Sequence, residues 1–340
     1  VSVASGATLR LFSDNVNFIF DRNLSDAGTV LVDPNAAGAG GSRDVNITGT
    51  NTGFSGTLLL QPSGTVAVNG SFRAIVTSQA SLGSATVNVK PGGQLWWTGN
   101  INNNIIISGT GFAEASGGTP AAGTGLAYGG IGALRMGPEL SGDITLDGTA
   151  KIQNYGATTI LSGTIGVTNP ADLLVVGGGG LGSTAIFTGT NNAAGAGSLN
   201  QIWVNSGSGT SGGTDTLQIG NNGTTGTLGL GNVILHADVA KTAVLRFSRS
   251  DGYTLAQDVL ASVNTASANL VRTGVQVNTT GSGLTLNGNT IDLSDGTNGG
   301  NLNVGPGANG AVLNIDAGAV VDLGYFGVGE AGNNSATVNQ

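Results

Sequence analysis

The chain of 340 residues contains 62 Gly, 7 Pro and no Cys, and 39% of its residues are hydrophobic. This composition supports a buried core, which excludes an intrinsically disordered chain. The lack of Cys excludes disulfide frameworks, thiolate metal sites and a Cys nucleophile, and it suits export through an oxidising compartment.

The 11 basic and 19 acidic residues give a formal charge of −8. Such a charge repels phosphate backbones, so we expect no nucleic-acid partner. We also expect no membrane-spanning segment, because no run of about 18 apolar residues occurs.

From the N-terminus onward, the recurring pattern is a strand of three to five alternating apolar and polar residues followed by a turn of Gly, Asn, Ser, Asp or Thr. Alternation of this kind predicts strands with one buried and one solvated face. Clear examples are Thr8–Leu11, Val16–Phe20, Thr86–Val89, Ile144–Leu146, Leu217–Ile219, Leu284–Leu286, Leu302–Val304 and Leu313–Ile315. Only residues 254–271 also admit a helical turn or two.

Strands this short, separated by Gly and Asn turns, favour a stacked coil over a sandwich, which needs longer strands, or a propeller, which carries aromatic signatures. We therefore predict an all-β fold: a parallel β-helix, or β-solenoid, expected to be right-handed, with about three short strands per coil and Gly or Asn at the corners. Residues 1–340 are expected to form one continuous solenoid. Extra residues leave the coil as loops, and we expect protrusions at residues 35–42 and 117–130.

Two internal repeats support stacked coils. The first is a hydrophobic residue followed by Thr or Ser, Gly and Thr, and it occurs at residues 47–51, 107–111, 161–165 and 187–191. The second is a strand, Val-Gly or Ile-Gly, a Gly/Asn-rich turn and another strand, and it begins near Val175, Gln218, Asn303 and Gly327.

These units resemble the autotransporter-associated β-strand repeat proteins, which are exported bacterial passengers and surface proteins. The resemblance lies in Thr48–Leu60, Ser81–Val87, Ile105–Gly111, Leu140–Leu146 and Leu245–Asp251, and the order of motifs spans most of residues 45–340. It implies a parallel β-helix, secretion and an adhesive or structural role at the bacterial cell surface, and it supplies no catalytic residues. The sequence departs from the family pattern at Gly53-Phe54, where a Tyr is usual after Asn-Thr, and it shows no outer-membrane barrel.

The sequence contains few residues in arrangements typical of catalysis. The single His, His236, alternates onto the side of Ile234 and has no Gly-x-Ser-x-Gly elbow to complete a triad, so we interpret it as a ladder or core-edge residue. Three pairs of acids and one charged patch keep a β-helix polysaccharide-degrading enzyme as an alternative. They are Asp292 with Asp295, Asp143 with Asp147, Asp316 with Asp322, and the patch of Arg246, Arg249 and Asp251.

We expect no catalytic, cofactor-binding or metal-binding residues and no enzyme activity. An incidental Ca²⁺ ion near Asp292–Asn301, which is rich in oxygen ligands, stays open as an alternative.

Two aromatic residues are candidate contact residues. In Gln94-Leu95-Trp96-Trp97 and Gln201-Ile202-Trp203-Val204, alternation turns Trp96 and Trp203 away from the core. An exposed Trp can stack on a sugar or pack against a neighbouring subunit.

The strand-like ends Val1–Val3 and Ala336–Gln340 carry no capping residues. Open solenoid ends pair with other strands, so we expect the chain to be part of a longer rod or to self-associate into a filament. The sequence thus favours a secreted, extracellular structural protein that forms a surface fibre or matrix rod. The alternative is an autotransporter-type adhesin that binds glycans or host or abiotic surfaces.

Overall fold

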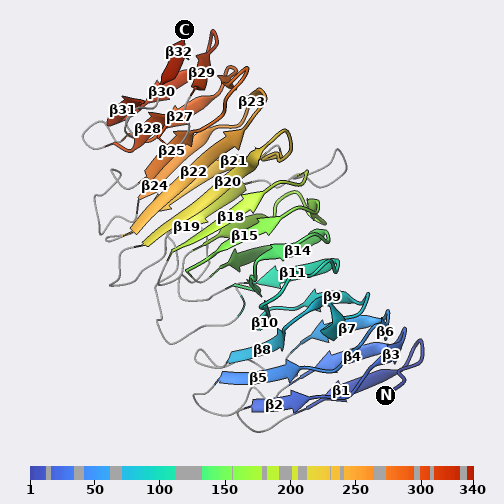
Figure 1. Ribbon diagram of the computed structural model, residues 1–340. Helices are drawn as coiled ribbons and strands as arrows, with labels where there is room; N and C mark the ends of the chain where they lie inside the picture. The colour runs from blue at the N-terminus through green and yellow to red at the C-terminus, as the bar shows by residue number, and fades with distance from the viewer. Residues whose placement is uncertain are drawn as a thin grey trace.

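The computed structural model describes residues 1–12, 17–33, 42–61, 71–109, 111, 132–154, 156–177, 182–190, 201–205, 213–229, 231–237, 241–263, 273–294, 299–306, 310–329 and 335–340. These residues form an elongated stack of short parallel strands (Figure 1). The strands follow one another in chain order from the blue N-terminal end to the red C-terminal end, so the two termini lie at opposite ends of the stack. The chain is therefore a parallel β-solenoid, as the alternation predicts.

Ladders of parallel strands run along the stack. The first ladder contains β1 (Thr8–Leu11), β4 (Thr29–Val32), β7 (Thr57–Leu60), β9 (Thr86–Val89), β11 (Ile105–Gly109), β14 (Ile144–Gln153) and β16 (Ile165–Val167). The second contains β2 (Asn17–Phe20), β5 (Ser42–Ile47), β8 (Ser71–Val76), β10 (Gly93–Trp97), β12 (Leu134–Arg135), the C-terminal part of β14, β17 (Leu173–Val176), β19 (Gln201–Asn205), β21 (Asn232–Ala237), β24 (Val259–Val263), β27 (Thr290–Asp292) and β30 (Val320–Asp322).

The remaining ladders complete the coil. The third ladder contains β13 (Glu139–Leu140), β15 (Thr158–Leu161), β18 (Ser183–Phe187), β20 (Gly213–Gly223), β22 (Lys241–Arg249), β25 (Thr273–Val277), β28 (Asn301–Val304) and β31 (Tyr325–Val328). The fourth contains β23 (Tyr253–Leu255), β26 (Leu284–Leu286), β29 (Ala311–Ile315) and β32 (Ala336–Asn339). Near the N-terminus β3 (Ser25–Asp26) pairs with β6 (Gly53–Phe54), and a short 3-10 helix η1 (Gln79–Ser81) precedes β9.

The chain visits these ladders in a fixed order. From β24 onward, successive strands belong to the second, third and fourth ladders and then return to the second. The expectation of about three short strands per coil is therefore confirmed.

The core is a set of columns of aliphatic side chains that run along the stack. In the first ladder, successive inward residues are in register and buried: Val30, Leu58, Val87, Ile105, Ile144 and Ile165. Within each strand, the residues that alternate with these inward residues face the other way; Asn88, next to Val87, is an example and is partly exposed. Alternation thus sets which face of each strand is buried.

The Gly of the Thr/Ser-Gly-Thr repeat marks a corner where consecutive coils approach closely. A Cβ atom on Gly163 would lie 2.1 Å from the carbonyl oxygen of Gly142, and one on Gly189 would lie 2.0 Å from that of Gly163. No side chain fits at these positions, so Gly in the repeat allows the backbones of consecutive coils to pack directly against each other.

A buried Asn side chain holds another corner. Asn51 is fully buried; its Oδ1 accepts a hydrogen bond from the Leu24 amide at 2.7 Å, and its Nδ2 donates to the Ser81 carbonyl at 2.7 Å. One side chain therefore links three successive coils. Asn222 instead takes the left-handed backbone conformation expected of a corner residue, with φ of 59°.

Two local expectations have different outcomes. Within residues 254–271, the helical alternative is wrong where the structure describes the chain, because β23 and β24 occupy residues 253–255 and 259–263. The expected protrusions at residues 35–42 and 117–130 lie outside the described residues, apart from Ser42, the first residue of β5.

Candidate functional site

Trp96 faces outward, as alternation predicts, while Leu95 and Trp97 on either side are fully buried. The half-buried indole is not a free platform. The guanidinium carbon of Arg135 lies 3.9 Å from the ring centroid and that of Arg73 lies 5.3 Å away. Cation–π contacts therefore occupy the ring surface that a sugar would need.

Trp203 also lies outside the main core, but it is not an exposed contact residue, because only 8% of its surface is accessible. It packs with Val175 and Ile234 in a second apolar cluster on the outward side of β17, β19 and β21. Its Nε1 donates a hydrogen bond to Gln201 Oε1 at 2.9 Å. The expectation of exposure is therefore wrong for Trp203, since its neighbours in the ladder are apolar on the outward face as well.

His236 is a ladder residue, as the sequence suggests. It is fully buried, it is in register with Asn205 and Ser262, and its Nδ1 lies 3.2 Å from Ser262 Oγ. A substrate in solvent cannot reach this imidazole. Asp238 lies outside the described residues.

Of the acids paired in the sequence, those that the structure describes do not converge on one cleft. Asp143 Oδ1 accepts the amide of Thr164 at 2.7 Å, and Asp147 forms an ion pair with Lys90 at 3.0 Å. Asp292 stacks in register with Asp322 of the next coil. Asp295, the other proposed partner of Asp292, lies outside the described residues. Among the described residues, no group of three or more His, Asp or Glu side chains is arranged to hold a metal ion.

The charged patch near residue 249 separates into two parts. Arg249 pairs with Asp251 through two hydrogen bonds of 2.8 Å and donates to the carbonyls of Thr224 and Gly226 at 2.6 Å. Hydrogen bonding to Arg249 lowers the pKa of Asp251. Arg246 belongs to a different surface, and its two hydrogen-bond partners are Gln218 and Gln276.

The structure contains a buried ionic cluster that the sequence patterns do not predict. Lys151, Asp215 and Lys241 are each at most 1% exposed, although they come from β14, β20 and β22. Burial lowers the pKa of Lys151 to about 8, a shift that Asp215 opposes and Lys241 reinforces. The only signal in the sequence is a Lys between two core residues, Ala150 and Ile152. The cluster is inaccessible, so it can stabilise the coil but cannot bind a ligand from solvent.

The C-terminal end of the stack exposes several large apolar side chains. In the third ladder the core-facing residues Val275 and Leu302 are fully buried, but Phe326, next in the same column, is 44% exposed. Val304 is 1% exposed and its neighbour Val328 is 46% exposed. The core therefore continues to the end of the described coils and is left open there.

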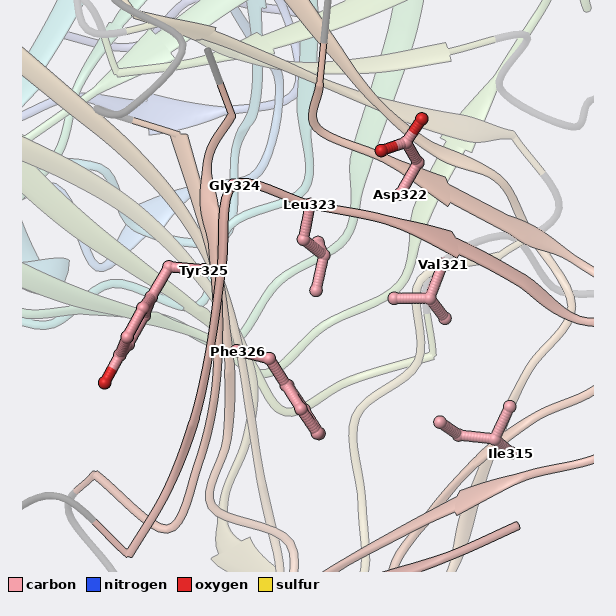
Figure 2. A pocket seen from close by; sticks show the side chains of 7 residues that line it. All are labelled: Ile315, Val321, Asp322, Leu323, Gly324, Tyr325 and Phe326. Atoms are coloured by element: carbon pink, nitrogen blue, oxygen red, sulfur yellow. The ribbon is translucent and has the colours of Figure 1, made fainter. Parts of the chain in front are cut away.

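A hollow of about 390 Å³ lies in this end surface. In Figure 2, Ile315, Val321, Leu323 and Phe326 surround it, whereas Tyr325 points away. The strands β30, β31 and β32 are each the last of their ladders among the described residues, so their outer edges carry backbone groups that a further parallel strand would pair.

The N-terminal end has the same character. Leu9 and Phe18 pack against the core but stay partly exposed, since β1 and β2 are the first strands of their ladders among the described residues. The two ends thus present parallel strand edges of the same polarity and incompletely covered core side chains.

Comparisons of the chain with protein-family models, with curated proteins and with solved structures found no match. Within the described part of the chain, no helix is long and apolar enough to cross a membrane.

Proposed function

We propose that this chain is a structural rod of an extracellular bacterial fibre or matrix, and that rods lengthen when the N-terminal coil of one copy stacks on the C-terminal coil of another. The observation that carries the proposal is the exposure of Phe326 and Val328 at the end of columns that are otherwise buried. The resemblance of the repeats to autotransporter-associated surface proteins and the Cys-free composition support export.

The geometry of the two ends supports head-to-tail contact. Because every pairing between named strands is parallel, the edges of β1 and β2 at one end and of β30 and β31 at the other have the polarity that a continued ladder needs. A contact between two different surfaces that does not close on itself generates an open filament. Covering the exposed half of a Phe or Val side chain stabilises such a contact by about 1 kcal/mol, and new backbone pairs add to it.

The proposal assigns the chain no catalytic role. His236 is buried, Arg249 and Asp251 neutralise each other, Asp143 accepts a backbone amide, and Asp147 pairs with Lys90. A rod of this kind works through its stacked backbone and continuous core.

Adjacent residues of β31 give a matched test. Phe326 and Tyr325 are 44% and 49% exposed, but Phe326 faces the end hollow and Tyr325 points away from it (Figure 2). We expect sedimentation and negative-stain electron microscopy to show rods that lengthen with protein concentration. F326K should raise the concentration needed for assembly by about tenfold or more, since it places a charge in the contact, and Y325K should assemble like the parent chain.

The proposal fails if the parent chain remains monomeric at every concentration tested. It also fails if F326K and Y325K change assembly equally, because a non-specific effect of charge would then explain the loss.

A further inference from the structure

The outer face of the third ladder carries a polar groove that is separate from the two ends. Its floor is a column of outward residues in register on neighbouring coils: Gln218 of β20, Arg246 of β22 and Gln276 of β25. Asn222, Ser248 and Asn278 contribute further amide and hydroxyl groups to a hollow of about 450 Å³. None of the described residues that line it carries a carboxylate.

Arg246 differs from three other arginines whose acidic partners the structure describes. Arg10, Arg73 and Arg249 each pair with an Asp carboxylate at 2.6–2.8 Å. Arg246 has no acidic partner among the described residues: its Nε donates to Gln276 Oε1 at 2.7 Å, and one terminal nitrogen lies 3.4 Å from Gln218 Oε1. The two glutamine side chains fix the guanidinium in place and leave its remaining N–H groups for a ligand.

This cation is costly without a counter-ion. Arg246 is half-buried, burial lowers its pKa, and no carboxylate of the described residues opposes the shift. Pairing with an anion offsets the free-energy cost of burying part of a guanidinium group. The planar guanidinium can also donate two parallel hydrogen bonds to the two oxygens of a carboxylate. In a chain with 19 acidic and 11 basic residues, an arginine left without an acid at the floor of a groove points to an external anion.

We propose that this groove binds a uronic-acid unit of an acidic polysaccharide, with the sugar carboxylate on Arg246 and the sugar hydroxyls on the surrounding amides and Ser248. Amide and hydroxyl groups both donate and accept hydrogen bonds, which suits hydroxyls better than it suits a bare ion. A single guanidinium balances the one charge of a carboxylate, whereas a phosphate carries nearly two. Parallel coils about 4.8 Å apart also present Gln218, Arg246 and Gln276 in a line along the rod, as a chain-like ligand requires.

The test uses isothermal titration calorimetry on the whole chain with three probes. The first is an oligogalacturonate, the second is the same oligosaccharide after reduction of its carboxyl groups, and the third is inorganic phosphate. We expect binding of the first that weakens with added salt, and little binding of the other two. R246Q should lower the affinity for oligogalacturonate by about tenfold or more. R22Q makes the same charge change at an exposed residue of the first coil and should leave the affinity unchanged.

A second variant covers the case in which R246Q does not fold. Q276E is nearly isosteric and places a carboxylate against the Nε of Arg246, so it should abolish binding and keep the thermal unfolding temperature of the parent chain. The proposal is overturned if the charged and reduced oligosaccharides bind equally or neither binds, or if phosphate binds more tightly than oligogalacturonate. It is also overturned if R246Q or Q276E, once folded, binds like the parent.

Discussion

The corner at Gly163 gives the sharpest prediction about stability. A Cβ atom there would lie 2.1 Å from the Gly142 carbonyl oxygen, and ordinary contact begins at 3.4 Å, so the coils must separate locally by about 1.3 Å. Hydrogen bonds beside this corner, from the Ser162 amide to the Leu140 carbonyl at 3.0 Å and from the Ile144 amide to the Thr164 carbonyl at 2.8 Å, would be stretched. With about 0.5 kcal/mol for weakening each of these two bonds and about 1–2 kcal/mol for overpacking, G163A should lower the local free energy of unfolding by about 2–3 kcal/mol.

A control lies three residues away. Gly166, in β16, has open space where a Cβ would be placed and no left-handed φ, so G166A should be neutral or stabilise the fold by up to about 1 kcal/mol. Stacked coils need not unfold in one step, so amide hydrogen exchange is the appropriate assay. The amides near the corner should exchange about thirtyfold or more faster in G163A, and at the parent rate in G166A. Equal exchange in the two variants would refute the close approach at Gly163.

Two further predictions concern buried polar groups. The pKa of Lys151 is about 8 in the folded chain and has its normal value of 10.5 in the unfolded chain. Between about pH 8 and 10.5, the unfolded state therefore binds more protons than the folded state. The free energy of unfolding should rise with pH over this range. Denaturant midpoints measured across this range should rise with pH in the parent chain and should rise less steeply in K151M, which lacks the titrating group. If the midpoints of the two proteins depend on pH with the same slope, the shifted pKa is contradicted. Removing the side chain of Asn51 leaves the Leu24 amide and the Ser81 carbonyl without their partner, so N51A should cost about 2–4 kcal/mol. N100A, at an exposed residue, should change thermal stability by less than about 0.5 kcal/mol, and similar losses in both variants would refute the role of Asn51.

The alternation of apolar and polar residues predicted the orientation of side chains well and their solvent exposure poorly. It correctly predicted that Trp97 faces the core and that Trp96 faces outward. It placed Trp203 outside the core but could not show that Val175 and Ile234 bury it on the outward side. The side to which a residue points depends on its own strand, whereas its exposure depends on neighbouring coils.

Polar partners were the least predictable feature of the candidate sites. Asp292 stacks on Asp322 of the next coil, and Arg246 meets glutamines 28 and 30 residues away. Neither pairing has a fixed spacing in the sequence, because the coils differ in length. For example, Ile105 lies beside Val87 on one side and beside Ile144 on the other, and the second partner is about twice as far away in the sequence as the first.

By itself, the sequence determined that this protein is built of short parallel strands with one buried face, since apolar residues alternate with polar ones and Gly stands where no side chain fits. Only the tertiary structure decided which residues meet across coils: the buried Lys151 and Asp215, the groove in which Arg246 meets two glutamines, and the open column that ends at Phe326. The physical reason is that alternation is a property of each strand, whereas register, burial and charge pairing arise when one coil stacks on the next.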